Sequence, residues 1–516
     1  MKVLFKNAKI IDGTNAPEFF GDVLTLDDKI IAVGDKIEAD GVYKIIDCEG
    51  LYVLPGFIDA HSHNDFFALR DNAEKYFAPF VKQGVTSQIV GHCGFSPFGV
   101  AAGSAHIDKV GGGLFKTDNP SSFVDFVNRC KGRLYLNLVP LIGHGTVRIG
   151  QSGYDSASLT EDKLEAMLNH VDEAMQNGAW GGSLGLMYEP GLYAKRSELV
   201  AFAKRIARHG GILTAHARAY SKIALGYRLL FSKPHMILAL EEFASIAKEA
   251  GAKAQYSHLI CIGKASFSCA KKILKKIHQY KKDGLDIEYD NYAFCFGATV
   301  LTVILPAWYM EKSKEERRDK KIVKKLRTMI NLTKMVLGLK FSDFVVAYLG
   351  EGEELKKMEG KNIEQLASEN GVSGFEMYIR LIELSDGKGR VIVHKYNNDR
   401  IIKDLVNDEH SIFMTDAWVE NEGIQNEAAF SGMTEFIKMA SEGIVPLEKA
   451  VYKMTGKTAA RYGIEDRGVI REGAVCDIVV MDVGEAAARH VMIGGEFVIE
   501  DGEFLGERAG KVLLKK

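Results

Sequence analysis

The segment Pro55-Gly-Phe-Ile-Asp-Ala-His-Ser-His63 follows the apolar run Leu51-Tyr-Val-Leu54 and indicates the architecture of this chain. Asp59, His61 and His63 are spaced two residues apart. Side chains alternate between the two faces of a strand, so these three point the same way. Burying one carboxylate and two imidazoles on one face is costly unless they bind something, and a divalent ion such as zinc is the simplest ligand. The segment therefore predicts a metal-binding strand end.

Apolar strands alternate with amphipathic helices through the middle of the chain, which is typical of a parallel sheet with crossover helices. About eight strands separated in this way favour a TIM-type (β/α)8 barrel, of the α/β class, over an open sheet. We expect this barrel to occupy residues 55–465. The expected strands after the first are Gly84–Val90, Leu134–Val139, Gly182–Leu186, Gly211–His216, Lys253–His258, Leu285–Tyr289 and Ser411–Asp416.

The alternation of strands and helices is interrupted between residue 309 and about residue 390. A charged segment begins at Glu311, and acidic residues interleave its lysines and arginines. This pattern predicts a solvated helical insertion that partly covers the mouth of the barrel.

Both ends of the chain read as short strands separated by turns. The N-terminal part covers residues 1–54, and the C-terminal part covers residues 466–516. Two β-rich ends around a long middle predict one composite β-sandwich domain built from both termini.

Composition limits the classes of partner that we expect. The 516 residues are 47% hydrophobic and 26% charged, with a net charge of −2, so no overall field attracts nucleic acid or an anionic membrane. The longest apolar stretch, residues 293–308, is shorter than the roughly 20 residues of a membrane span. Seven scattered cysteines suit a reducing compartment rather than a disulfide framework. We expect a cytoplasmic protein that acts on a small molecule, without nucleic-acid or membrane partners.

Four residues outside the first strand lie where predicted barrel strands end, which is where barrel enzymes place their chemistry. They are Cys93, His216, His258 and Asp416. A cysteine thiolate beside histidines is a strong zinc donor. The competing interpretations are that Cys93 is a small buried apolar residue and that Asp416 is the N-cap of the following helix.

Three ligands and a water form a catalytic zinc site, in which the metal activates the water and polarises a carbonyl group. A carboxylate within reach takes a proton and passes it to a leaving nitrogen. This set of parts suits hydrolysis of an amide or a cyclic amide.

On these residues the chain resembles the amidohydrolase superfamily, and within it most closely the N-acyl-D-amino-acid deacylases (D-aminoacylases). The matching segments run in order along nearly the whole chain. They are Pro55–His63, Gly84–Ser96, Gly143–Arg148, Gly185–Gly191, Ala215–Arg218, Tyr256–His258 and Arg467–Val480.

The resemblance implies that Cys93, His216 and His258 hold one zinc tightly, and that His61 and His63 form a second, weaker metal position. It also implies that Asp416 is the general base and acid for water attacking the amide carbonyl. Hydantoinase-like relatives bridge two metals with a carboxylated lysine. Cys93 replaces that lysine here.

The chain departs from these relatives at two positively charged positions. Ile260 stands where relatives usually carry a lysine, and residues 425–430 read Gln-Asn-Glu-Ala-Ala-Phe in place of a His-Pro-Arg-like element. Other side chains must then contact the substrate. The candidates are His144, Arg148, Tyr188, Arg218 and Tyr292.

The leading hypothesis is a zinc-dependent hydrolase of a non-peptide C–N amide bond, acting on an N-acyl-D-amino acid or a related amide. The alternative is a cyclic amide hydrolase acting on a hydantoin, dihydropyrimidine or imide, which fits the loss of positive charge. Deamination of an amine-bearing ring is a third hypothesis. A catalytically silent barrel is the fourth, and the combination of four histidines with Cys93 and Asp416 argues against it.

Overall fold

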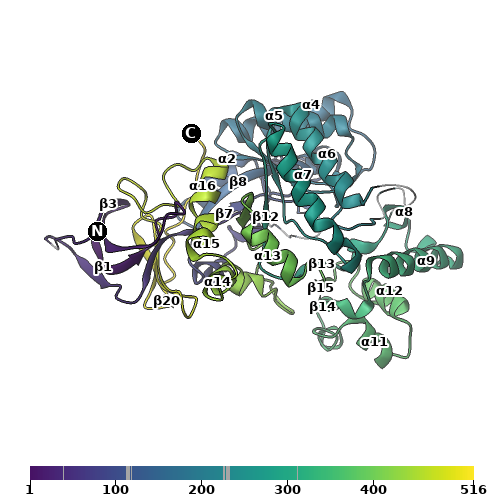
Figure 1. The fold of residues 1–516 in the computed structure, drawn as a ribbon. Coiled ribbons are helices and arrows are strands. Elements are labelled where there is room, and N and C mark those ends of the chain that lie inside the picture. Colours follow the sequence, from purple (N-terminus) through teal and green to yellow (C-terminus); the bar gives the residue numbers. More distant parts are fainter. Residues whose placement is uncertain are drawn as a thin grey trace.

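A computed structural model gives the fold of the chain (Figure 1). It describes residues 1–516 except 39, 112–114, 116, 118, 225–226, 228–232 and 311, together with the side chain of Ala307. The strands of both chain ends lie on one side of a barrel, and a separate group of helices and strands lies on the other side.

The barrel contains eight parallel strands whose spatial order follows the sequence. This confirms the predicted TIM-type barrel. The strands are β6 (Phe57–Asp59), β7 (Val85–Val90), β8 (Asn137–Gly143), β9 (Gly181–Gly185), β10 (Ile212–His216), β11 (Lys253–Tyr256), β12 (Ile287–Asn291) and β16 (Ser411–Phe413). Strands β7 to β10 are buried along their whole length, as expected for parallel strands that are covered on both faces. The third strand lies later than expected, because the apolar run continues to Gly143.

Helices surround the barrel and cover the apolar outer faces of its strands. They are α1 (Glu74–Val81), α2 (Phe123–Cys130), α3 (His144–Ser152), α4 (Glu161–Gln176), α5 (Arg196–Arg208), α6 (His235–Ala250), α7 (Ala270–Lys282), α13 (Asp399–Asn407), α14 (Ala428–Ser441), α15 (Leu447–Met454) and α16 (Gly456–Tyr462). Local sequence fixes several of their starts. Ser122, Thr160 and Asn398 cap α2, α4 and α13 by accepting hydrogen bonds from backbone amides of the first turn.

The barrel closes where its first and last strands end. The amide of Ala60 donates to the carbonyl of Phe413 over 3.2 Å, and the amide of Asp416 donates to the carbonyl of His61 over 3.0 Å. Asp59 reinforces this seam, because its carboxylate accepts from the amide and the hydroxyl of Thr415 at 2.9 and 2.7 Å. The segment that carries His61 and His63 is thereby joined to the segment that carries Asp416.

Strands from both chain ends form one nine-stranded sheet, as expected for a β-rich domain built from both termini. Its N-terminal strands are β1 (Lys2–Ile10), β2 (Phe19–Leu26), β3 (Lys29–Gly34), β4 (Lys44–Asp47) and β5 (Tyr52–Pro55), and its C-terminal strands are β17 (Ile478–Asp482), β18 (Ala487–Ile493), β19 (Glu496–Glu500) and β20 (Glu503–Phe504). Strand β5 joins the halves by pairing with both β1 and β17. It ends at Pro55, two residues before the first barrel strand, so the sheet sets the entry into the barrel.

Between β12 and β16 the chain leaves the barrel and forms an insertion that contains both helices and strands. Its helices include α8 (Ala307–Met310), α9 (Lys320–Leu337), α10 (Glu353–Lys356), α11 (Ile363–Glu369) and α12 (Gly374–Leu384). Strands β13 (Phe296–Val300), β14 (Phe344–Tyr348) and β15 (Arg390–His394) add an antiparallel sheet that the charge pattern did not predict. Glu311, where the charged segment begins, lies outside the described residues.

No helix within the described part of the chain is long and apolar enough to cross a membrane.

Candidate metal centre and active site

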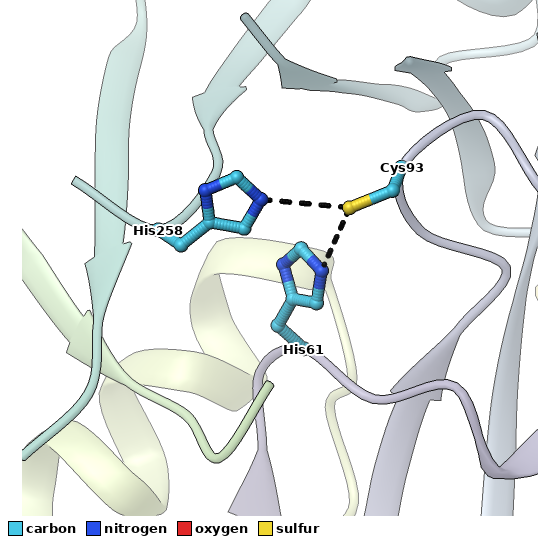
Figure 2. A group of neighbouring side chains, drawn as sticks. All are labelled: His61, Cys93 and His258. Atoms are coloured by element: carbon cyan, nitrogen blue, oxygen red, sulfur yellow. Dashed lines mark hydrogen bonds between the residues drawn. The ribbon is translucent and has the colours of Figure 1, made fainter. Parts of the chain in front are cut away.

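The strand-end residues from distant parts of the chain converge at one end of the barrel. Cys93 lies at the centre of the group, as Figure 2 shows for two of its neighbours. Its Sγ lies 3.4 Å from Nε2 of His61, 3.5 Å from Nε2 of His258 and 3.6 Å from Nδ1 of His216. All four side chains are buried.

A second group of donors shares His61 with the first. Oδ1 of Asp416 lies 3.5 Å from Nε2 of both His61 and His63. Ligand atoms of His61, Cys93 and His258 lie within 4.8 Å of one another, and so do those of His61, His63 and Asp416. The two groups therefore form neighbouring donor sets that share His61. His216 is in neither group and approaches the first set through its 3.6 Å contact with Cys93.

These separations suit a bound metal. Zinc ligands at about 2.0–2.3 Å in tetrahedral geometry lie roughly 3.3–3.7 Å apart, which matches the spacings around Cys93. Burial raises the pKa of Cys93 and lowers that of His61 and of His216 well below the ordinary value. A buried thiol among neutral imidazoles is a donor set suited to a metal ion, and thiolate plus imidazole donors favour zinc over hard cations such as magnesium.

The backbone holds three of these residues in the left-handed region. The φ angles of Cys93, His258 and Asp416 are 54°, 33° and 44°. Non-glycine residues adopt this region at an energetic cost, and such residues cluster where a site requires them. Each comes just after a barrel strand, so the turn directs its side chain toward the barrel axis.

Two features of strand β9 fix the Cys93 loop. The hydroxyl of Ser183 accepts from the amide of Gly94 at 2.9 Å and donates to the carbonyl of Gly91 at 2.5 Å. A Cβ on Gly185 would lie 2.0 Å from the carbonyl oxygen of Cys93. The loop can approach this strand only because residue 185 has no side chain.

Buried carboxylates support the histidines from behind. Asp290, at the end of β12, accepts a hydrogen bond from the amide of His258 at 2.6 Å, and its Oδ1 lies 3.5 Å from Nδ1 of His61. Burial raises the pKa of Asp290 to about 7, and burial also raises that of Asp59 to about 7. Asp290 is not among the residues predicted from the sequence, although its position at a strand end was the available signal.

Asp416 differs from these carboxylates because 27% of its side chain is exposed. Desolvation would raise its pKa, but the surrounding histidines, chiefly His61 and His258, hold the pKa well below its ordinary value. An ionised, partly exposed carboxylate beside the donor sets can accept a proton from a molecule in the cavity.

A cavity of about 40 Å³ lies next to the two donor sets. Its polar wall contains His63, Cys93, His258 and Asp416, and the rest of its lining is Phe115, Tyr188, Ala298, Thr299 and Trp418. Ala298 and Thr299 belong to β13, so the insertion contributes to the wall. Sequence spacing carried no signal for Phe115 or Trp418, which contact each other edge-to-face with ring centroids 4.9 Å apart.

Of the predicted substrate contacts, Tyr188 lines this cavity and Tyr292 does not. The hydroxyl of Tyr188 lies 3.1 Å from Nδ1 of His216, and Tyr188 lines the cavity. Tyr292 is buried, and its hydroxyl donates to the carbonyl of Phe296 at 2.6 Å.

The other predicted contacts are engaged with carboxylates away from the cavity lining. Nε2 of His144 and Nε of Arg148 both lie 3.0 Å from Oε1 of Glu198. Arg218 forms a bidentate ion pair with Glu242, with its Nε at 3.0 Å. Local spacing did not reveal these partners, because Glu198 lies 50 residues after Arg148.

Comparison with known proteins agrees with this geometry. A profile described as Amidohydrolase family matches residues 44–181. A D-aminoacylase of Alcaligenes xylosoxydans xylosoxydans is 26% identical over 99% of this chain and 97% of its own length. The chain resembles the D-aminoacylases along nearly its whole length. An N-acyl-D-aspartate deacylase of the same organism is 27% identical, over 93% of this chain and 85% of its own length.

A solved D-aminoacylase described as having a binuclear metal centre has the same fold as this chain. The TM-score is 0.79 at 25% identity, and the match covers 100% of this chain and 99% of that protein. The fold, the candidate metal-binding groups and these relatives together identify the protein as an enzyme of the metal-dependent amidohydrolase type.

Proposed function

We propose that this amidohydrolase is a zinc enzyme that hydrolyses the amide bond of N-acyl-D-amino acids or closely related amides. The observation that carries the proposal is the convergence of the strand-end histidines on Cys93 and Asp416, both of which line one cavity. The D-aminoacylase and deacylase relatives along nearly the whole chain support the substrate class.

Cys93, His216 and His258 would hold a tightly bound zinc, and His61 and His63 a weaker second metal. Nδ1 of His216 and Nε2 of His258 both face the Cys93 sulfur, at 3.6 and 3.5 Å. When bound, zinc supplies Lewis-acid chemistry that polarises a carbonyl oxygen and makes water nucleophilic near neutral pH.

The roles of the chain's own residues follow from their positions around the cavity. Oδ1 of Asp416 takes the proton of the attacking water and then delivers it to the amide nitrogen as that nitrogen leaves. Tyr188 is placed to hydrogen-bond the substrate beside His216. Phe115 and Trp418 form an apolar wall that excludes water and receives the apolar part of the substrate.

A cyclic amide, such as a hydantoin, dihydropyrimidine or imide, is the second candidate substrate. The cavity lining contains no lysine or arginine among the described residues, and Arg148 and Arg218 are engaged with carboxylates. A substrate carboxylate therefore lacks an evident cationic partner, whereas a neutral ring needs none.

The test is hydrolysis of a substrate panel by the purified enzyme loaded with zinc. The panel pairs N-acetyl- and N-formyl-D-amino acids and their L-enantiomers with hydantoin, dihydrouracil and cyclic imides. Asp416→Asn removes the base, and Asp162→Asn on the exposed face of α4 is the matched control. Zinc content is measured for each variant, so that loss of metal is distinguished from loss of the base.

We expect turnover of the D-acyl compounds, unchanged turnover in Asp162→Asn, and a fall of about 10²–10⁴-fold in Asp416→Asn with zinc retained. Turnover of the ring compounds alone would favour cyclic amides over N-acyl-D-amino acids as the substrate class. Turnover that is unaffected by Asp416→Asn would refute the assigned role of Asp416.

A further inference from the structure

We propose that the chain carries another divalent-metal site, formed by His278, Glu409 and His410 at the opposite end of the barrel from the active site. His278 belongs to α7, and the other two residues lie in the turn between α13 and β16. This turn precedes Ser411, the first residue of β16, whereas Asp416 follows the end of the same strand. A site here is separated from the catalytic donors by the length of a barrel strand.

The three side chains already have nearly the spacing that a zinc ion requires. One ligand atom of each lies within 4.8 Å of the others. Oε1 of Glu409 lies 3.7 Å from Nε2 of His410 and 4.0 Å from Nδ1 of His278. Tetrahedral zinc separates such ligands by about 3.4 Å, so the two separations from Glu409 exceed this value by roughly 0.3–0.6 Å. Two imidazoles and one carboxylate are a common protein donor set for zinc.

Asp408 orients the site without occupying a ligand position. Its Oδ2 lies 2.6 Å from Nε2 of His278, which leaves Nδ1 facing Glu409. A carboxylate on the outer nitrogen of a histidine is the usual support for a metal-ligating imidazole, because it fixes the tautomer and the ring orientation. Oδ1 of the same carboxylate accepts from the amide of His410 at 2.8 Å. The Asp408 side chain therefore contacts both histidines and fixes their relative positions.

The turn itself is anchored to the barrel. The amide of Tyr289 donates to the carbonyl of His410 at 3.2 Å, and the ammonium groups of Lys453 and Lys457 donate to the carbonyls of Asp408 and Glu409. These bonds use backbone oxygens and leave the Glu409 carboxylate 74% exposed. An incoming ion would find the backbone of this turn held in place, with open coordination for water.

Positive charge near the site is largely compensated. Lys281, one turn after His278, is the basic neighbour that lowers the pKa of His410 beyond the larger effect of burial. Its ammonium lies 3.1 Å from Glu288 and 3.6 Å from Asp286. Glu409 and Asp408 add two carboxylates at the site, and the ammonium groups of Lys453 and Lys457 are engaged with backbone carbonyls of the same turn.

The experiment is zinc titration by calorimetry of the tag-free enzyme whose catalytic site is already loaded and freed of excess metal. The variants are His278→Ala and Glu409→Gln, the latter at a mainly exposed side chain, so that folding is preserved. His209→Ala is the matched control, because Nε2 of His209 lies 3.0 Å from a single carboxylate, that of Asp172, and lies in none of the clusters with metal-ligand spacing found among the described residues.

We expect wild type and His209→Ala to bind one more zinc per chain than His278→Ala and Glu409→Gln do. Zinc should raise the melting temperature of wild type and His209→Ala more than that of the two site variants, because a ligand bound only by the folded state stabilises it. kcat/KM of all four proteins should agree, which separates this site from the catalytic one. Equal zinc uptake by wild type and Glu409→Gln, or no uptake beyond the catalytic metal, would overturn the proposal.

Discussion

Replacing Arg148 by methionine should destabilise this amidohydrolase without acting on the substrate. The Arg148 side chain is fully buried and donates to Glu198 at 3.0 Å and to the carbonyls of Asp155 and Ala157 at 3.0 and 2.8 Å. Methionine fills similar volume but leaves Glu198, whose side chain is 6% exposed, with only the His144 imidazole. Breaking one side of a buried ion pair costs about 3–5 kcal/mol.

Hydrogen exchange is the appropriate measurement, because a large chain of several structural units does not unfold in one step. Glu198 lies in α5 and Arg148 in α3, so amides of these helices should exchange roughly 10²–10³-fold faster in Arg148→Met. Glu198→Gln removes the charge instead. The double variant should recover part of the loss, because it no longer buries an unpaired carboxylate.

The effect should also depend on pH. Burial alone would raise the pKa of Glu198, but His144 and Arg148 lower the pKa below its ordinary value. A carboxyl group with a lowered folded pKa contributes stability above its unfolded pKa and loses it as the pH falls through the folded value. The loss of stability caused by Arg148→Met should therefore be greatest at neutral pH. It should become smaller below about pH 4, as the Glu198 carboxylate becomes protonated. Unchanged hydrogen exchange in Arg148→Met together with a fall in kcat/KM would refute this reasoning. It would indicate instead that Arg148 contacts the substrate.

Three further predictions concern the metal centre. Ser183→Ala removes both hydrogen bonds that hold the Cys93 loop, and we expect zinc affinity, measured by competition with a chelator, to fall about 10–100-fold with the fold retained. Gly185→Ala places a Cβ against the Cys93 carbonyl, so it should lower both the melting temperature and the zinc content, and a normal zinc content would contradict the packing described. Removing metal from wild type with a chelator should abolish turnover, zinc should restore it, and Cys93→Ala should not be restored. Activity that survives complete removal of metal would refute the zinc assignment.

Much of the catalytic end was predictable because a barrel fixes where strand ends lie. Parallel strands end at the same edge, so a polar residue that closes an apolar run is directed to the common mouth. Cys93, His216, His258 and Asp416 each close such a run, and the structure brings them together with His61 and His63 at this end of the barrel. The same reasoning would have included Asp290, which ends β12.

Asp59 shows where local spacing stopped being informative. Its position two residues before His61 predicted a side chain directed with the histidines. The structure places Thr415 beside it, 356 residues later in the chain, and the carboxylate accepts two hydrogen bonds across the seam. Whether a strand-end carboxylate faces a metal or a neighbouring strand depends on which strand closes the barrel.

The sequence by itself determined the alternation of strands and helices, the contribution of both termini to one sheet, and the set of candidate donors at the strand ends. These properties follow from local periodicity and from residue chemistry at strand ends. Only the tertiary structure decided that Arg148 and Arg218 pair with Glu198 and Glu242, and that β13 and Trp418 form the cavity wall. Such contacts join residues far apart in the chain. Their geometry depends on how the helices and the insertion pack, which local spacing does not specify.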